Sequence, residues 1–236
     1  MTERVTDYEG QATSRALELL RDTDTAWHAV NGFDFGACLS ILKQGIEPSR
    51  QFGGREAVSL ILSPFDENAG DHRTFMYYAG KSISFPVPKP DISANYGTDE
   101  IQYPSLIPRQ YLKGIMIPEY FADTAIGKLP RLKVHKLSKI EPYINRQIAA
   151  IANFQPEGVE QKAVDQLRSM GQQYADRYDS YEARKKMADE INSFVLNKYE
   201  VIFGKILGTD QPTLRQAVKY LGAKFGLETL TLPLDF

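Results

Sequence analysis

Two residues stand at the ends of predicted strands, where their side chains could do chemistry. His28 closes a short extended segment, AWHAV, directly before a polar turn and an apolar helix. Glu100 opens a later extended segment, EIQY. An imidazole exchanges protons near neutral pH, and a carboxylate accepts hydrogen bonds. Each residue also has an ordinary explanation, a histidine satisfied by a neighbour and a solvated glutamate at a strand end.

The elements that position His28 are predicted from its neighbours. Tryptophan, alanine and valine around it favour an extended backbone, and apolar residues recur at helical spacing over residues 35–46. Asp34 is placed to cap this helix, because its carboxylate can accept from a first-turn amide. Gly45 then marks the helix end. The sequence therefore predicts a strand, a turn and a capped helix, with the histidine at the strand tip.

The histidine, small residue, polar turn and helix ending in SILKQGIEP together resemble the opening motif of the ADP-ribosyltransferase superfamily. The stretch DEIQYPSLIPRQYLKGIMI resembles the closing motif of its poly(ADP-ribose)-polymerase-like, or H-Y-E, type. The resemblance covers about residues 24–120. It implies an α+β fold with a split antiparallel β core, and NAD as a substrate.

The resemblance also implies roles for individual residues. Glu100 falls on the catalytic glutamate, and His28 on the residue that binds the adenosine-side ribose of NAD. The backbone of Ala29 would hold the nicotinamide carboxamide, and Ser63 matches the polar residue that ends the second core strand. A fixed carboxylate suits this reaction because positive charge develops on the ribose as nicotinamide leaves.

An aromatic ring that stacks on nicotinamide completes the family's site. Tyr77 or Tyr78 in TFMYYAG matches this residue, and a flat ring can cover the pyridinium face. A second alignment places Lys81-Ser82 on the family's Ser-Lys-Ser signature and Phe85 on the stacking aromatic. We prefer Tyr78, because residues 82–87 are the better candidate for the next strand.

Other site chemistries find little support in the sequence. It has no Walker loop, no G-x-G-x-x-G and no nucleophile elbow, and its three histidines, His28, His72 and His135, are widely spaced, which predicts no metal site. The Glu-x-Glu pair of arginine-modifying toxins is missing, since Thr98 stands two residues before Glu100. Cys38, the single cysteine, is predicted to be a small buried residue.

Composition limits the partners and the compartment. The 236 residues carry a net charge of −2, which gives no overall case for nucleic acid. A protein acceptor is the expected partner. Nucleic acid would need a local basic rim, formed by Arg109, Lys113, Arg131, Lys133 and Lys136. No apolar run approaches the roughly 18 residues of a membrane span, so we expect a cytoplasmic protein, or one secreted by a signal-peptide-independent route.

The chain is predicted to divide near Pro156. Residues 1–155 would form an ADP-ribosyltransferase-like α+β domain that begins with a helix over residues 11–24, and residues 156–236 a helical extension. The prolines that follow residue 85 predict a sheet edge or a loop. The expected function is NAD-dependent ADP-ribosyl transfer to a protein or other macromolecular acceptor, as in a toxin or effector. The alternative is a catalytically inactive module of the same fold that acts through its helical half.

Overall fold

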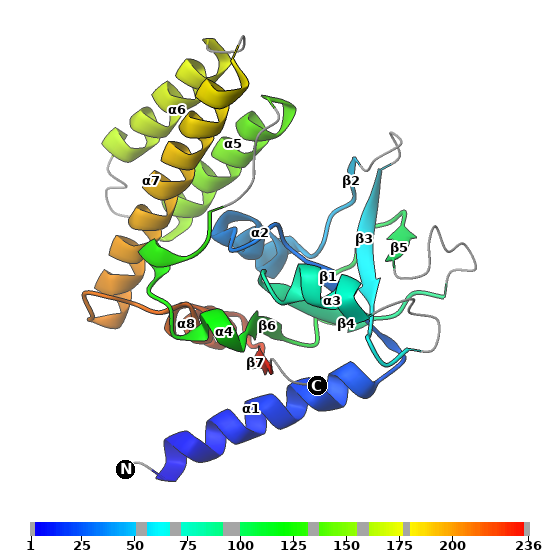
Figure 1. The fold of residues 1–236 in the computed structure, drawn as a ribbon. Coiled ribbons are helices and arrows are strands. Elements are labelled where there is room, and N and C mark those ends of the chain that lie inside the picture. Colours follow the sequence, from blue (N-terminus) through cyan, green and yellow to red (C-terminus); the bar gives the residue numbers. More distant parts are fainter. Residues whose placement is uncertain are drawn as a thin grey trace. The chain divides into compact units, whose positions relative to one another are not determined.

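The computed structural model describes residues 3–50, 56–66, 72–91, 100–131, 137–154, 161–176 and 180–233 (Figure 1). The chain forms two compact units. The sheet unit comprises Met1–Gly32, Ile41–Asp123 and Leu214–Phe236, and the helical unit comprises Phe33–Ser40 and Thr124–Thr213. This division differs from the predicted boundary near Pro156, because the helical unit already begins at Thr124 and the last segment of the chain belongs with the sheet.

The sheet unit is a mostly antiparallel sheet with helices, so the α+β class is confirmed. Its strands are β1 (Thr25–Ala29), β2 (Ser49–Arg50), β3 (Glu56–Leu62), β4 (Ser84–Pro88), β5 (Glu100–Tyr103), β6 (Ile115–Pro118) and β7 (Thr229–Leu232). They follow the order β2-β3-β1-β4-β6-β7, and β5 pairs with β3. Only the β6–β7 pair is parallel among the described strand pairs.

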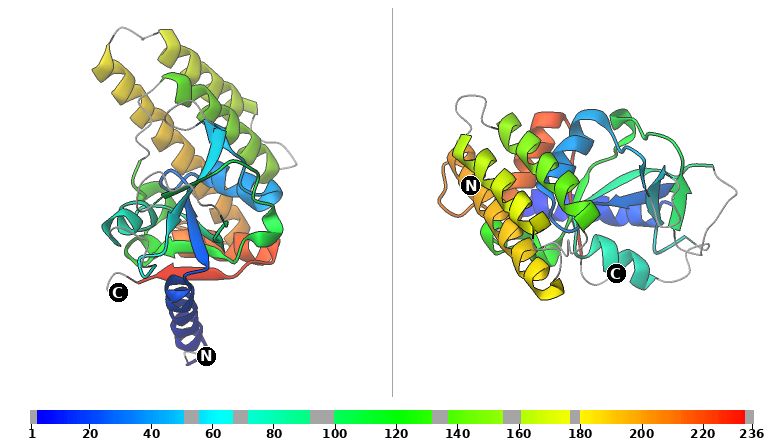
Figure 2. Two further views of the ribbon diagram at one scale, coloured as in Figure 1. Left: turned by 90° about the vertical axis from the view of Figure 1, so that its right-hand side faces the viewer. Right: turned by 90° about the horizontal axis from the view of Figure 1, so that it is seen from above.

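Helices of the sheet unit are α1 (Glu3–Arg21), α3 (His72–Ala79), η1 (Arg109–Tyr111), α4 (Glu119–Ala122) and α8 (Leu214–Phe225). One apolar cluster joins α1, α3 and the sheet, and its members include Leu20, Trp27, Ile61, Phe75 and Leu230. The indole of Trp27 meets the ring of Phe75 edge-on, with centroids 5.5 Å apart. Figure 2 shows β7 lying beside α1, which explains why the C-terminal segment returns to this unit.

The sequence predicted a sheet edge or a loop for the prolines of β4, and this prediction is wrong. β4 lies between β1 and β6, with Pro86 opposite Trp27. A proline removes only one amide donor from the hydrogen-bond ladder between two strands. The β4–β6 pairing is limited to Ser84 and Met116, and the carbonyl of Pro86 still accepts from the amide of Lys113 at 2.8 Å. A central strand therefore tolerates these prolines, because few of its backbone amides have to donate hydrogen bonds to neighbouring strands.

The helical unit is built from η2 (Ile126–Lys128), α5 (Leu137–Phe154), α6 (Gln161–Asp176) and α7 (Tyr181–Leu207), and it includes the first residues of α2 (Phe35–Gln44). Asp34 caps α2, since its Oδ1 accepts from the amide of Ala37 at 2.9 Å, and this prediction is confirmed. The same carboxylate accepts from Arg146 at 2.7 Å and from Gln147 at 2.6 Å, so it fastens α2 to α5.

Helix α7 has both its ends defined by local chemistry. Ser180 caps its start by accepting from the amide of Ala183, and Gly208 ends it in a left-handed conformation with φ of 67°. In the described part of the chain, no helix combines the length and the apolar character needed to cross a bilayer.

Candidate functional site

Four polar residues lie on three neighbouring strands of the sheet unit, with the side chains of Ser59, Glu100 and Gln102 on one face and that of His28 on the other. We call this group, His28, Ser59, Glu100 and Gln102, the polar strip. All four residues are half-buried, while the apolar residues between them, such as Leu60 and Ile101, are buried. Alternation along β3 and β5 explains the pattern, because successive side chains of a strand point to opposite faces of the sheet. The strip is therefore a set of partly buried polar groups that are joined through Ser59.

The carboxylate of Glu100 is held by one of its two oxygens. Ser59 Oγ donates to Glu100 Oε1, and Gln102 Nε2 donates to the same oxygen at 2.7 Å. Ser59 stands opposite Gln102 in the β3–β5 register, so all three side chains lie on one face. No bond to Oε2 is found within the described residues. One carboxylate oxygen is thus fixed, and the other is available to a ligand.

His28 approaches the strip from β1. Its Nδ1 lies 3.0 Å from the carbonyl oxygen of Ser59, which can only accept, so Nδ1 carries the proton of this hydrogen bond. Burial lowers the pKa of His28, although its bond to Ser59 opposes the shift. The imidazole is therefore neutral near pH 7, and its Nε2 has a lone pair that can accept from a hydroxyl.

Strand register places His28 and Glu100 on alternate faces of the pleated sheet. Trp27 is opposite Ile61, and Ile61 is opposite Glu100, so these three share a face, whereas His28 is opposite Phe85. The β1–β3 ladder is short, ending at the Trp27–Ile61 pair. Beyond that pair the His28 side chain bonds the β3 backbone. The structure thus joins the imidazole and the carboxylate through one residue, Ser59, rather than by a direct contact.

The predicted stacking tyrosines lie on α3. Tyr77 is 63% exposed and Tyr78 is 44% exposed, and their rings meet edge-on with centroids 5.1 Å apart. The buried face of α3 packs Phe75 against Trp27, on the face of the sheet that also carries Glu100. Phe85 is fully buried. Between the two alignments, only the tyrosines have a ring face that a ligand could cover.

Residues of the second alignment make contacts of their own. Lys81 Nζ lies 5.0 Å from the centre of the Tyr77 ring. Ser82 Oγ donates to the carbonyl oxygen of Tyr78 at 2.6 Å. These contacts hold the turn after α3 and stabilise the position of the tyrosine pair.

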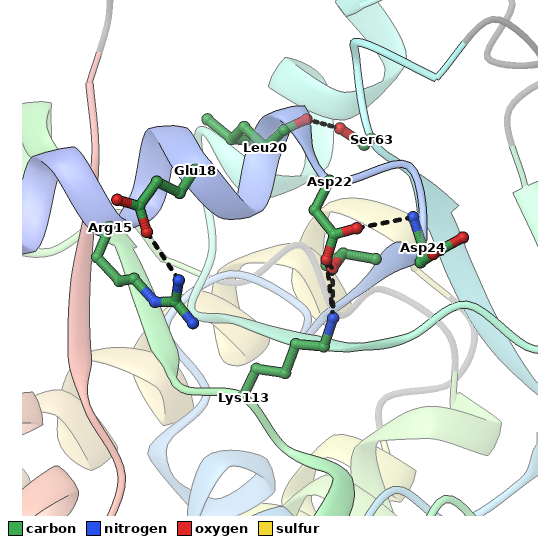
Figure 3. A network of polar contacts seen from close by, with 8 residues as sticks. Arg15, Glu18, Leu20, Asp22, Asp24, Ser63 and Lys113 are labelled. Atoms are coloured by element: carbon green, nitrogen blue, oxygen red, sulfur yellow. Dashed lines mark hydrogen bonds and ion pairs between the residues drawn. The ribbon is translucent and has the colours of Figure 1, made fainter.

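Ser63 and Ala29 occupy different surroundings. Ser63 is buried, and its Oγ donates to the carbonyl oxygen of Leu20 (Figure 3). Asp22 anchors the same end of α1, because its carboxylate accepts from Lys113 Nζ at 3.1 Å (Figure 3). Ser63 is thus joined to α1 and not to the polar strip. Ala29 is half-buried and follows His28, so its backbone lies beside the strip.

The cysteine, the possible metal ligands and the other histidines give no further candidate for the site. Cys38 is buried, and burial raises the pKa of its thiol far above the ordinary value, as expected for a small core residue. The described residues contain no group of three His, Cys, Asp or Glu side chains that could hold a metal ion. The side chain of His72 and the whole of His135 lie outside what the structure describes.

The predicted basic rim is partly used for internal contacts. Arg109 donates to the carbonyl oxygen of Phe225 at 2.6 Å and lies over its ring. Lys113 pairs with Asp22. Arg131 lies in the helical unit, and Lys133 and Lys136 fall outside the described residues.

Sequence reasoning missed Ser59 and Gln102. Both carried a signal, since Ser59 interrupts the apolar run VSLIL and Gln102 stands two positions after Glu100, on the same face of a strand. Finding the pair required the β3–β5 register.

The comparison with known proteins found no relative of this chain. No protein-family model, curated protein or solved structure matches this chain.

Proposed function

We propose that the protein is an NAD-dependent ADP-ribosyltransferase that transfers ADP-ribose to a protein or other macromolecular acceptor. The observation that carries the proposal is the polar strip, in which Ser59 connects a neutral His28 to the Glu100 carboxylate. His28 and Glu100 belong to two motifs that lie far apart in the sequence. A toxin or effector role is consistent with this chemistry.

In the proposed reaction, the bond between nicotinamide and the ribose breaks and nicotinamide leaves with the bonding electrons. The ribose then carries positive charge, which the free oxygen of Glu100 stabilises. His28 accepts a hydrogen bond from a ribose hydroxyl through Nε2. Tyr78 covers the pyridinium ring, with Tyr77 beside it. The acceptor then forms a bond to the ribose carbon that nicotinamide left and releases its proton to water, so the charges balance.

The acceptor is proposed to be a protein because two of the described residues of the predicted basic rim already make internal contacts. Arg109 and Lys113 are engaged with Phe225 and Asp22. A net charge of −2 also provides no general attraction for phosphates.

Labelled NAD and the Glu100→Gln variant test the proposal. Glutamine keeps an oxygen that can accept from Ser59 but removes the negative charge, and losing one such electrostatic contact commonly costs about 10²- to 10³-fold in rate. Glu119→Gln is the matched control, because Glu119 is an exposed glutamate of the same unit. We expect release of nicotinamide by the wild type and the control but not by Glu100→Gln.

Equal release by all three proteins would contradict the assignment of Glu100. If no protein releases nicotinamide and NAD does not raise the melting temperature, the result would favour an inactive module that acts through its helical half.

A further inference from the structure

We propose that Gln102 is a positioning residue, which holds one oxygen of Glu100 so that the other faces the substrate. The inference rests on the proposed function and extends it to a residue that no motif indicated. Gln102 Nε2 donates to Glu100 Oε1 at 2.7 Å, and Ser59 donates to the same oxygen. Because Ser59 and Gln102 are register partners on β3 and β5, the two donors approach the carboxylate from adjacent strands.

A second feature of Gln102 is the state of its amide oxygen. The amide oxygen of Gln102, Oε1, is buried and has no hydrogen-bond partner among the described residues. Buried polar atoms are nearly always paired, and an unpaired one lowers stability. An apolar side chain would avoid this cost, so the bond to Glu100 is the contact that explains a glutamine here.

Fixing one carboxylate oxygen has a direct consequence for catalysis. A carboxylate held by a single bond can rotate about the bond that joins it to its side chain, which moves both oxygens. Two donors on Oε1 oppose this rotation and therefore set the direction of Oε2. An anion that is already oriented needs no reorganisation as charge develops on the substrate.

The test compares wild type, Gln102→Leu, Gln102→Glu and the control Gln110→Leu, which changes an exposed glutamine of η1. Leucine removes the donor and adds no polar group, and glutamate replaces the donor with a second negative charge. For NAD consumption, we expect kcat of Gln102→Leu to fall roughly 10- to 100-fold, the range for a lost bond to a charged group. KM should stay unchanged, because the contact acts in the transition state. The melting temperature should change little, because the lost bond to Glu100 is offset by the removal of the unpaired amide oxygen.

Each result of these experiments either supports or contradicts the proposed role of Gln102. An unchanged kcat in Gln102→Leu, or a lower melting temperature with kcat and KM both changed, would overturn it. If wild type and Glu100→Gln consume NAD equally, the proposed function fails, and the side-chain amide resonances of Gln102 then test the positioning role separately. Slow exchange of these protons in the wild type that is lost in Glu100→Ala supports positioning, whereas identical spectra refute it.

Discussion

Asp34 should be among the most sensitive positions of the helical unit. Its side chain is 1% exposed and accepts three hydrogen bonds, from Ala37, Arg146 and Gln147. In Asp34→Ala, the cap of α2 is lost and the buried amide of Gln147 has no acceptor. The guanidinium of Arg146 is 37% exposed, so water can replace its lost partner. The cap contributes about 1 kcal/mol and the unpaired amide about 1–3 kcal/mol, so we expect a loss of about 2–4 kcal/mol.

Urea unfolding measures this loss. Helical ellipticity reports the helices of both units, including α5, α6 and α7, while fluorescence of Trp27, the single tryptophan, reports the sheet unit alone. With a slope of about 2 kcal/mol per molar urea, the ellipticity midpoint should move down by roughly 1–2 M.

The matched control for Asp34 is Asp123→Ala. Asp123 pairs with Arg215, but its side chain is 75% exposed, so its loss should cost less than about 1 kcal/mol. Asp34→Asn keeps an oxygen for Ala37 and should fall between the two. Equal midpoints for Asp34→Ala and Asp123→Ala would refute the view that Asp34 joins α2 to α5.

Two further predictions concern the sheet unit. Burial lowers the pKa of His28 in the folded state below the ordinary value of 6.5, so the unfolded chain binds the proton more readily, and stability should fall as the pH drops below about 6.5. His28→Gln should show a flatter stability profile below about pH 6.5 in urea titrations, and identical profiles would contradict the assignment. Ser63→Ala, which removes the bond to Leu20, should lower the melting temperature, whereas Ser59→Ala should mainly lower the rate of nicotinamide release. The same loss of rate in both variants would show that the two serines are not distinct in function.

Local signals predicted the elements around His28 well. The strand, the cap at Asp34 and the helix after it depend on residues close in sequence, and all three are confirmed. Long-range pairing was not predictable in the same way. The C-terminal tail joins the sheet because Leu230 and Leu232 are buried beside β6 and α1, partners far away in the chain.

The residues of the polar strip show the same difference between local signals and long-range pairing. His28 and Glu100 stand at strand ends and were found by type and position. Ser59 and Gln102 become significant only when β3 and β5 are aligned, since neither residue type is unusual in a strand. Ser63 illustrates the reverse case, because its place at a strand end suggested a ligand contact but its hydroxyl bonds the end of α1.

A structure of the Glu100→Gln variant with NAD tests the central claim most directly, because this variant should bind NAD without consuming it. We predict that the nicotinamide-side ribose lies within hydrogen-bond distance of residue 100 and the adenosine-side ribose at His28 Nε2. The ring of Tyr78 should cover the nicotinamide. NAD bound away from His28 and residue 100, or no binding at millimolar concentration, would contradict the account.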